Sequence, residues 1–164
     1  MSLEGSNTSE DGGGRYLAFD LGEETFAVEV GRVEVVLEPI PITRVPKAPP
    51  QFRGVINYRG SVIPVADLSI RFGREPSSDQ KSIIVLRVRY GDQDVTIGVL
   101  ADRVHEVIAI DPSRIQSPPA AGGADSDALI SGIASKGDSF IVLLDIDKAF
   151  SEGSAVAEAG AEAS

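Results

Sequence analysis

Apolar and polar residues alternate in short runs along most of the chain, which is typical of half-buried β-strands. Residues 25–30 and 94–100 show this alternation most clearly. Glycine-bearing segments between such runs predict hairpin turns, at LGEET, YRGS, RYGDQD and SKGDS. Short helices are expected over residues 67–72 and 145–150, each opened by an aspartate that can cap exposed backbone N–H groups. The pattern therefore predicts a mainly β protein.

The order of these elements is repeated along the chain, and this repeat says more about organisation than any single motif. The segment from Gly54 to Phe72 has a counterpart from Gly132 to Phe150, with a glycine, an aspartate and a phenylalanine at the same spacing. Upstream of these segments, RVEVVL and RVHEVI form a second matching pair. The chain therefore contains two copies of one β-rich unit.

The two copies span roughly residues 16–72 and 83–150. Each holds about five strands, and closing five short strands into a barrel removes their exposed edges. We expect two pseudo-symmetric five-stranded barrels packed side by side, with short helices and with elements able to swap between barrels. An eight-stranded lipocalin-like barrel is the alternative, but it does not explain the repeat. Residues 1–14 and 151–164 have too little apolar surface to order themselves and are expected to be disordered tails around the domain at 15–150.

The composition excludes several classes of chemistry. The chain has no cysteine and one histidine, which removes disulfides, thiol nucleophiles, zinc fingers and histidine-pair metal sites. We therefore expect no metal and no cofactor. The apolar runs are shorter than the about 20 residues that cross a bilayer, and the acidic N-terminus does not resemble a secretion signal. A cytoplasmic protein is expected.

The charge also limits the partners. A formal net charge of −10 opposes binding to nucleic acid or to anionic lipid. The six Phe, three Tyr and no Trp offer few rings for stacking bases, which disfavours an oligonucleotide-binding barrel. Within this acidic chain, residues 44–89 hold nine Lys or Arg against three Asp or Glu. This basic segment is either an ordinary solvated surface or a face for an acidic protein partner.

Asp67 and Asp145 form a candidate catalytic pair, because two units with one aspartate each is also the plan of an aspartic protease. In such enzymes two carboxylates about 3 Å apart share a proton and activate water. That site needs an Asp-Thr-Gly or Asp-Ser-Gly turn, which neither aspartate has, so helix capping is the simpler interpretation. His105 lacks a partner for a triad or a metal site and is interpreted as a surface residue. We expect no enzyme, with an aspartyl hydrolase as the remote alternative.

Two pairs of valines favour a binding surface instead. Val33 and Val36 are three residues apart, as are Val104 and Val107, and this spacing does not fit strict strand alternation. Either a β-bulge absorbs the mismatch, or one valine of each pair faces outward. Outward valines would line an apolar groove that suits a partner helix.

The segment Asn57-Tyr58-Arg59-Gly60 predicts a hairpin, because Asn and Gly tolerate positive φ. An arginine at a rigid hairpin tip is also a fixed bidentate donor for a carboxylate on a partner. Pro64 in the following strand removes a ladder donor, so this strand should be an edge or hold a bulge there. The hairpin is therefore a second candidate contact.

The block GVINYRGSVIPVADL, which begins at Gly54, resembles the N-x-R-G-x-[VI]-[IV]-P-[VI]-x-D-L block of the CheW family of chemotaxis coupling proteins. The segments YLAFDLGEETFAVEV, RVEVV and IGVLADRVHEVIAI also match the family pattern, so the resemblance covers about residues 15–150. It implies two five-stranded SH3-like barrels. It also implies a non-catalytic adaptor that joins the cytoplasmic tips of chemoreceptors to the histidine kinase CheA in membrane-associated arrays.

The resemblance also implies a set of receptor-facing positions, and it assigns no kinase-contact residue. These positions are Val33, Val36, Gly54, Asn57, Arg59, Gly60, Val104 and Val107. Family members often carry a glutamate where this chain has Val35, and Glu34 and Glu38 lie nearby instead, which leaves the partner of Arg59 open. A coupler of a related chemosensory pathway, for twitching or development rather than swimming, is the alternative function.

Overall fold

The computed structural model describes residues 14–72, 81–117 and 130–150. The predicted tails, apart from Gly14, lie outside these ranges. In chain order, the elements are β2 (Arg15–Leu21), β3 (Glu24–Glu29), the 3-10 helix η2 (Val30–Arg32), β4 (Val33–Leu37), β5 (Phe52–Tyr58), β6 (Ser61–Ala66), α1 (Leu68–Arg71), β7 (Ser82–Tyr90), β8 (Gln93–Ala101), β9 (Arg103–Ala109), the 3-10 helix η3 (Pro112–Arg114), β10 (Ile115–Gln116), β11 (Ile130–Lys136), β12 (Ser139–Leu144) and α3 (Ile146–Ala149).

The local predictions from the sequence are confirmed. Helices α1 and α3 directly follow Asp67 and Asp145, whose side chains cap them. The four glycine-bearing segments form the turns of the hairpins β2–β3, β5–β6, β7–β8 and β11–β12, each with a glycine at positive φ. Strand β6 pairs with β8 only through Val65 and Ala66, so Pro64 lies on a stretch that pairs with β5 alone.

The strands form two sheets, with the orders β4-β7-β8-β6-β5 and β10-β11-β12-β3-β2-β9. Read from β9, the second sheet repeats the first: an edge strand, a hairpin, a parallel contact and another hairpin. The two-residue strand β10 makes the second sheet six-stranded, where five strands were expected. The protein is therefore mainly β, with two pseudo-symmetric SH3-like barrels.

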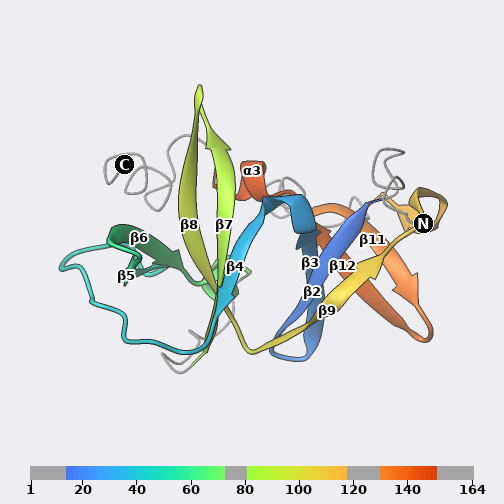
Figure 1. Cartoon of the computed structure of the whole chain (residues 1–164). Helices are drawn as coiled ribbons and strands as arrows, with labels where there is room; N and C mark the ends of the chain where they lie inside the picture. Colours follow the sequence, from blue (N-terminus) through green and yellow to red (C-terminus); the bar gives the residue numbers. More distant parts are fainter. Residues whose placement is uncertain (1–13, 73–80, 118–129, 151–164) are drawn as a thin grey trace.

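The leading hairpin of each repeat is exchanged between the halves of the chain. Strands β2 and β3 pair with β9 and β12, whereas β7 and β8 pair with β4 and β6. Figure 1 shows the blue hairpin among the yellow and orange strands, and the yellow-green hairpin beside cyan β4. The ranges 16–72 and 83–150 therefore mark the two repeats, and each sheet combines strands from both of them.

The burial of the exchanged hairpins explains this topology. One hydrophobic core fills each barrel, and a third lies in the seam between the barrels. On β7, Ile83 and Val85 belong to the first barrel, whereas Ile84 and Leu86 belong to the seam. A strand that is apolar on both faces must be covered on both sides, because apolar surface is costly to leave in water. Because β7 lies between the first-barrel core and the seam core, both of its apolar faces are buried.

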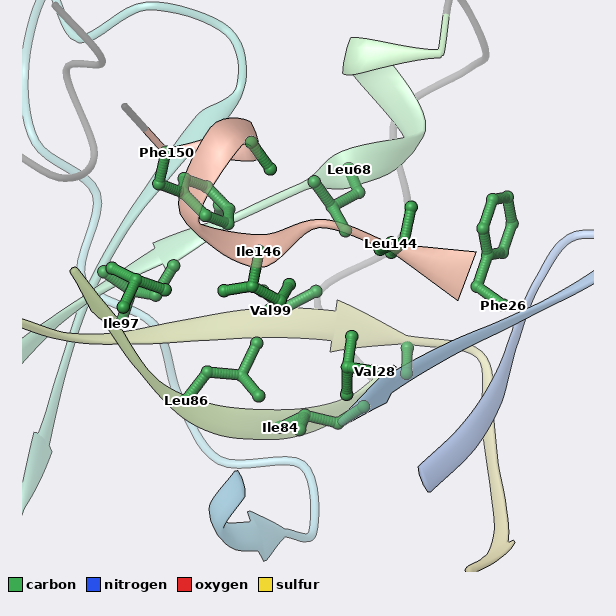
Figure 2. Packing of buried hydrophobic residues seen from close by; sticks show 14 of the residues in the cluster. Phe26, Val28, Leu68, Ile84, Leu86, Ile97, Val99, Leu144, Ile146 and Phe150 are labelled. Carbon is green, nitrogen blue, oxygen red and sulfur yellow. The ribbon is translucent and has the colours of Figure 1, made fainter. Parts of the chain in front are cut away.

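The seam joins elements from both repeats. Figure 2 shows Ile146 and Phe150 of the second repeat close to Leu68 of the first, with Val99 of β8 beneath them. Phe26 on β3 stacks on Phe72, with ring centroids 5.1 Å apart. The seam thus buries apolar faces that neither barrel covers alone, as the repeat predicted.

A single residue, Asp102, carries the chain from β8 in the first sheet to β9 in the second. Its backbone N–H donates to the carbonyl of Asp20 at 2.9 Å. Its carboxylate accepts from the N–H of Gly22 and pairs with Lys81 Nζ at 3.0 Å. Partial burial alone would raise the pKa of Asp102, but the bonds from Gly22 and Lys81 outweigh it and hold the pKa below its ordinary value. The charged carboxylate therefore stabilises this crossover.

Replacing Asp102 with asparagine is expected to lower the free energy of unfolding by about 1.5 kcal/mol near neutral pH, the scale of a hydrogen bond to a charged group. A carboxyl group whose pKa is lowered by folding stabilises the protein above its unfolded pKa, and this contribution is lost as the pH falls through the folded pKa. In urea unfolding, the difference between variant and parent should shrink as the pH falls below the ordinary value of 3.8. A difference that does not change with pH, or an equal loss in the exposed control Asp94→Asn, would count against this role.

Candidate functional site

The valine pairs lie on the two pseudo-equivalent edge strands, β4 and β9. A β-bulge lies between each pair: the register shifts between Val33 and Val35 opposite β7, and between the partners of Val107 and Val104 on β2. Val36 is 40% exposed and Val107 is 37% exposed. Both features that the sequence offered as alternatives are therefore present, because each edge strand has a β-bulge and also an outward-facing valine.

The inward members of the two pairs pack against the same hydrophobic core. Val33 and Val104 are both half-buried and pack against the seam core. Beside Val104, a groove of about 520 Å³ runs along β9 and is lined in part by Ile108 and Phe140. The side chain of Phe140 is 65% exposed. The second edge strand therefore borders a groove of mixed polar and apolar lining, and the exposed valines Val36 and Val107 are not among the residues that line it.

The predicted hairpin is confirmed and is tightly defined. Arg59 and Gly60 form a two-residue turn with φ values of 54° and 83°, the positive range that such turns require. The backbone N–H of Gly60 donates to Asn57 Oδ1 at 3.2 Å. The guanidinium of Arg59 lies over the ring of Tyr58, 5.1 Å from its centroid, and Tyr58 in turn packs against the first-barrel core. The tip of the hairpin therefore carries an exposed arginine whose side chain packs on Tyr58.

The carboxylates near Val35 do not supply a partner for this arginine. Glu34 pairs with Arg87 on β7, with Oε1 3.7 Å from Nε. In the described part of the chain, no carboxylate forms an ion pair with Arg59.

Gly54 on β5 is buried and makes a close backbone contact. Its φ is 146°, and a Cβ at this position would lie 2.2 Å from the carbonyl oxygen of Thr43. Thr43 and Val55 exchange two backbone hydrogen bonds of 2.8 Å, which join the segment after β4 to β5. The missing side chain of Gly54 therefore lets these two backbone segments meet, and its place among the receptor-facing positions stays a prediction.

Both aspartates of the candidate catalytic pair serve as helix caps. In Asp67, which is fully buried, Oδ1 accepts from the N–H of Ser69 at 3.0 Å and Oδ2 accepts from Arg53 Nη1 at 2.9 Å. Asp145 Oδ1 accepts from the N–H of Lys148 at 3.1 Å. A proton-sharing dyad needs carboxylate oxygens aimed at one another and at water. Both oxygens of Asp67 are used inside the fold, so the capping interpretation is confirmed and the hydrolase gains no support.

His105 lies on the surface, as expected, and its Nε2 is 2.9 Å from Asp20 Oδ2. Asp20 also accepts from the hydroxyl of Thr25 at 2.8 Å. Across residues 14–72, 81–117 and 130–150, no group of three or more His, Cys, Asp or Glu side chains is placed to hold a metal ion. The helices in those ranges are all too short or too polar to span a membrane.

Comparisons with known proteins agree with this arrangement. The chain is 34% identical over 137 residues to the chemotaxis protein CheW of Thermotoga maritima, covering 83% of this chain and 87% of that protein. It is 31% identical over 105 residues to the protein PilI of Pseudomonas aeruginosa, covering 63% of this chain and 58% of that protein. The crystal structure of the scaffolding protein TtCheW from Thermoanaerobacter tengcongensis matches with a TM-score of 0.72 and 34% identity, covering 84% of this chain and 92% of that one. The family model of the CheW-like domain matches residues 15–154, and the chain therefore belongs to the CheW family.

Proposed function

We propose that the chain is a non-catalytic adaptor that joins the cytoplasmic tips of chemoreceptors to the histidine kinase CheA. The observation that carries this proposal is the pair of pseudo-equivalent edge strands, each exposing one valine, on a member of the CheW family. We name the proposed receptor-binding surface the receptor face. It consists of Val33, Val36, Arg59, Val104 and Val107, with Asn57 and Gly60 shaping the turn and Gly54 supporting it from beneath.

The contacts on the receptor face suit a helical partner. A helix laid over an apolar groove uses anchors three and four residues apart, and each valine that it covers contributes about 1.5 kcal/mol. Arg59 adds a charge-assisted bond to a carboxylate on the helix, which fixes orientation more than it adds affinity. The rigid barrels then hold the kinase at a fixed position relative to the receptor.

The function of such an adaptor is a coupling free energy between two partners. A receptor state that binds the adaptor–kinase complex more tightly shifts the kinase toward the conformation favoured in that complex. Couplings of this kind are typically about 1–3 kcal/mol, or roughly 5- to 150-fold in an equilibrium constant. The adaptor needs no reactive group for this, and the internal use of Asp67 supports a role without catalysis.

The experiment that tests this function is size-exclusion chromatography of the purified chain with a soluble receptor cytoplasmic fragment and with CheA. We expect a ternary complex that contains all three proteins, and a binary complex with each partner alone. Failure of the chain to bind either partner would contradict the proposal.

The second candidate is a coupler in a related chemosensory pathway. It is favoured by the similarity to PilI of Pseudomonas aeruginosa, a relative that is not named as a chemotaxis protein. The same physical mechanism applies, and only the receptor and the kinase differ. Capture with receptor and kinase pairs from each pathway of one organism distinguishes the two, because the cognate pair should bind more tightly.

A further inference from the structure

The two crossovers between the sheets occupy equivalent places in the repeats but are held by different groups. One runs from β3 through η2 to β4, and the other runs from β8 through Asp102 to β9. Val33 pairs with Leu86 just as Val104 pairs with Phe19, so the strands β7 and β2 can be compared residue by residue. Counting onward from these pairs, Arg87 corresponds to Asp20 and Arg89 corresponds to Gly22.

At the second crossover, Asp102 itself satisfies the backbone groups of the neighbouring hairpin. Its N–H donates to the carbonyl of Asp20, and its carboxylate accepts from the N–H of Gly22. The residue at the equivalent place in the first crossover is Gly31, which has no side chain. The first crossover therefore needs other donors and acceptors for the same two backbone groups.

At the first crossover, the donor is the side chain of Arg32 and the acceptor is the carboxylate of Asp147. Arg32 Nη1 donates to the carbonyl of Arg87 at 3.2 Å, and the N–H of Arg89 donates to Asp147 Oδ1 at 2.8 Å. Arg32 also forms a bidentate pair with Asp147, with Nη1 2.9 Å from Oδ1 and Nη2 2.5 Å from Oδ2. Asp147 lies in α3, 115 residues after Arg32. One carboxylate of the second repeat thus ties together the crossover and β7.

This tie exists in one repeat only. The cap residues Asp67 and Asp145 correspond, so the residue of α1 that matches Asp147 is Ser69, which has no carboxylate and is buried. The hydrogen bond that Arg32 donates to Asp147 is the largest cause that raises the pKa of Arg32, as expected for a well-formed pair. The side chains of Arg32 and Asp147 are 34% and 35% exposed, so the pair is partly screened by water. Such a pair orients its neighbours and contributes modestly to folding.

We propose that Asp147 is a positioning residue, through which α3 fixes the first crossover and the orientation of Val33 and Val36 on β4. Arg32 directly precedes Val33, so any rotation of η2 about the pair moves the start of the valine strand. The consequence for receptors rests on the proposed function, whereas the tie itself does not. The two parts are therefore tested by separate readouts.

The first readout is amide hydrogen exchange in the full chain, comparing the parent with Asp147→Ala. We expect the backbone amide of Arg89 to exchange about tenfold faster in the variant, because the Asp147 carboxylate that accepts its hydrogen bond is gone. We also expect faster exchange over residues 30–35, because Arg32 loses its partner. The matched control is Asp94→Ala, which removes the carboxylate 3.8 Å from the side chain of the same Arg89 and should leave these amides unchanged. Unchanged exchange at Arg89 in Asp147→Ala would overturn the tie.

The second readout is the affinity for a receptor cytoplasmic fragment, at a temperature where circular dichroism shows all three variants below to be fully folded. We expect Asp147→Ala to weaken binding about three- to tenfold, Arg32→Lys to weaken it less, and Asp94→Ala to leave it unchanged. Faster exchange at Arg89 with parental affinity would overturn the positioning role. If the parent itself does not bind the fragment, the proposed function fails, and the exchange result still decides whether Asp147 holds the crossover.

Discussion

Replacing Asp67 with alanine is expected to lower the free energy of unfolding by about 3–5 kcal/mol, the cost of removing one partner of a buried ion pair. Arg53 is only 8% exposed and would lose the carboxylate that lies 2.9 Å from its Nη1. The same change removes the cap of α1, which packs Leu68 into the seam. Urea unfolding followed by far-ultraviolet circular dichroism measures the loss.

The pseudo-symmetry of the chain provides the control. Asp145→Ala removes the equivalent cap from α3, but Asp145 is only half-buried, so its loss should be about 1 kcal/mol, the usual cost of a cap. Equal losses in the two variants would mean that the buried pair with Arg53 adds nothing to stability.

Replacing Gly54 with alanine is expected to cost about 2–4 kcal/mol, because both overpacking and an unfavourable φ oppose the new side chain. The Cβ would lie 2.2 Å from the carbonyl oxygen of Thr43, and this backbone atom cannot turn aside as a side chain could. The contact between the segment after β4 and β5 should therefore open. Thermal and urea unfolding measure the effect.

Gly31→Ala is the matched control for Gly54. A Cβ on Gly31 meets no atom within 4 Å, and the residue is exposed in η2, so stability should change by less than about 0.5 kcal/mol. A similar small change for Gly54→Ala would show that the approach of Thr43 does not require glycine.

The features that could be predicted from the sequence are those that depend on local chemistry. Asp67 and Asp145 predict the helices that follow them, because a carboxylate at this position caps exposed backbone N–H groups. The turn at Arg59 and Gly60 follows from residues that tolerate positive φ. The outward valines were one of two open interpretations, and only the register of the strands shows that bulge and exposure occur together.

The features that could not be predicted depend on pairing between distant segments. Strands β3 and β8 have similar apolar patterns, so the sequence does not say which parallel partner each takes. One signal was available: Ile83, Ile84, Val85 and Leu86 form a continuous apolar run, which indicates a strand buried on both faces. No local pattern connects Arg32 with Asp147, because the two residues are 115 positions apart and their pairing does not produce a recognisable sequence motif.

We propose that the receptor face transmits receptor state to the kinase. Receptor-controlled CheA autophosphorylation, reconstituted with receptors in membranes, tests it most directly with the parent, Val36→Asp and Val45→Asp. Both valines are exposed, at 40% and 38%, so neither change should unfold the protein, but only Val36 lies on the receptor face. We expect Val36→Asp to reduce control about tenfold or more, because a buried unpaired carboxylate is costly, and Val45→Asp to match the parent. Equal control by Val36→Asp and the parent would contradict this role of the receptor face.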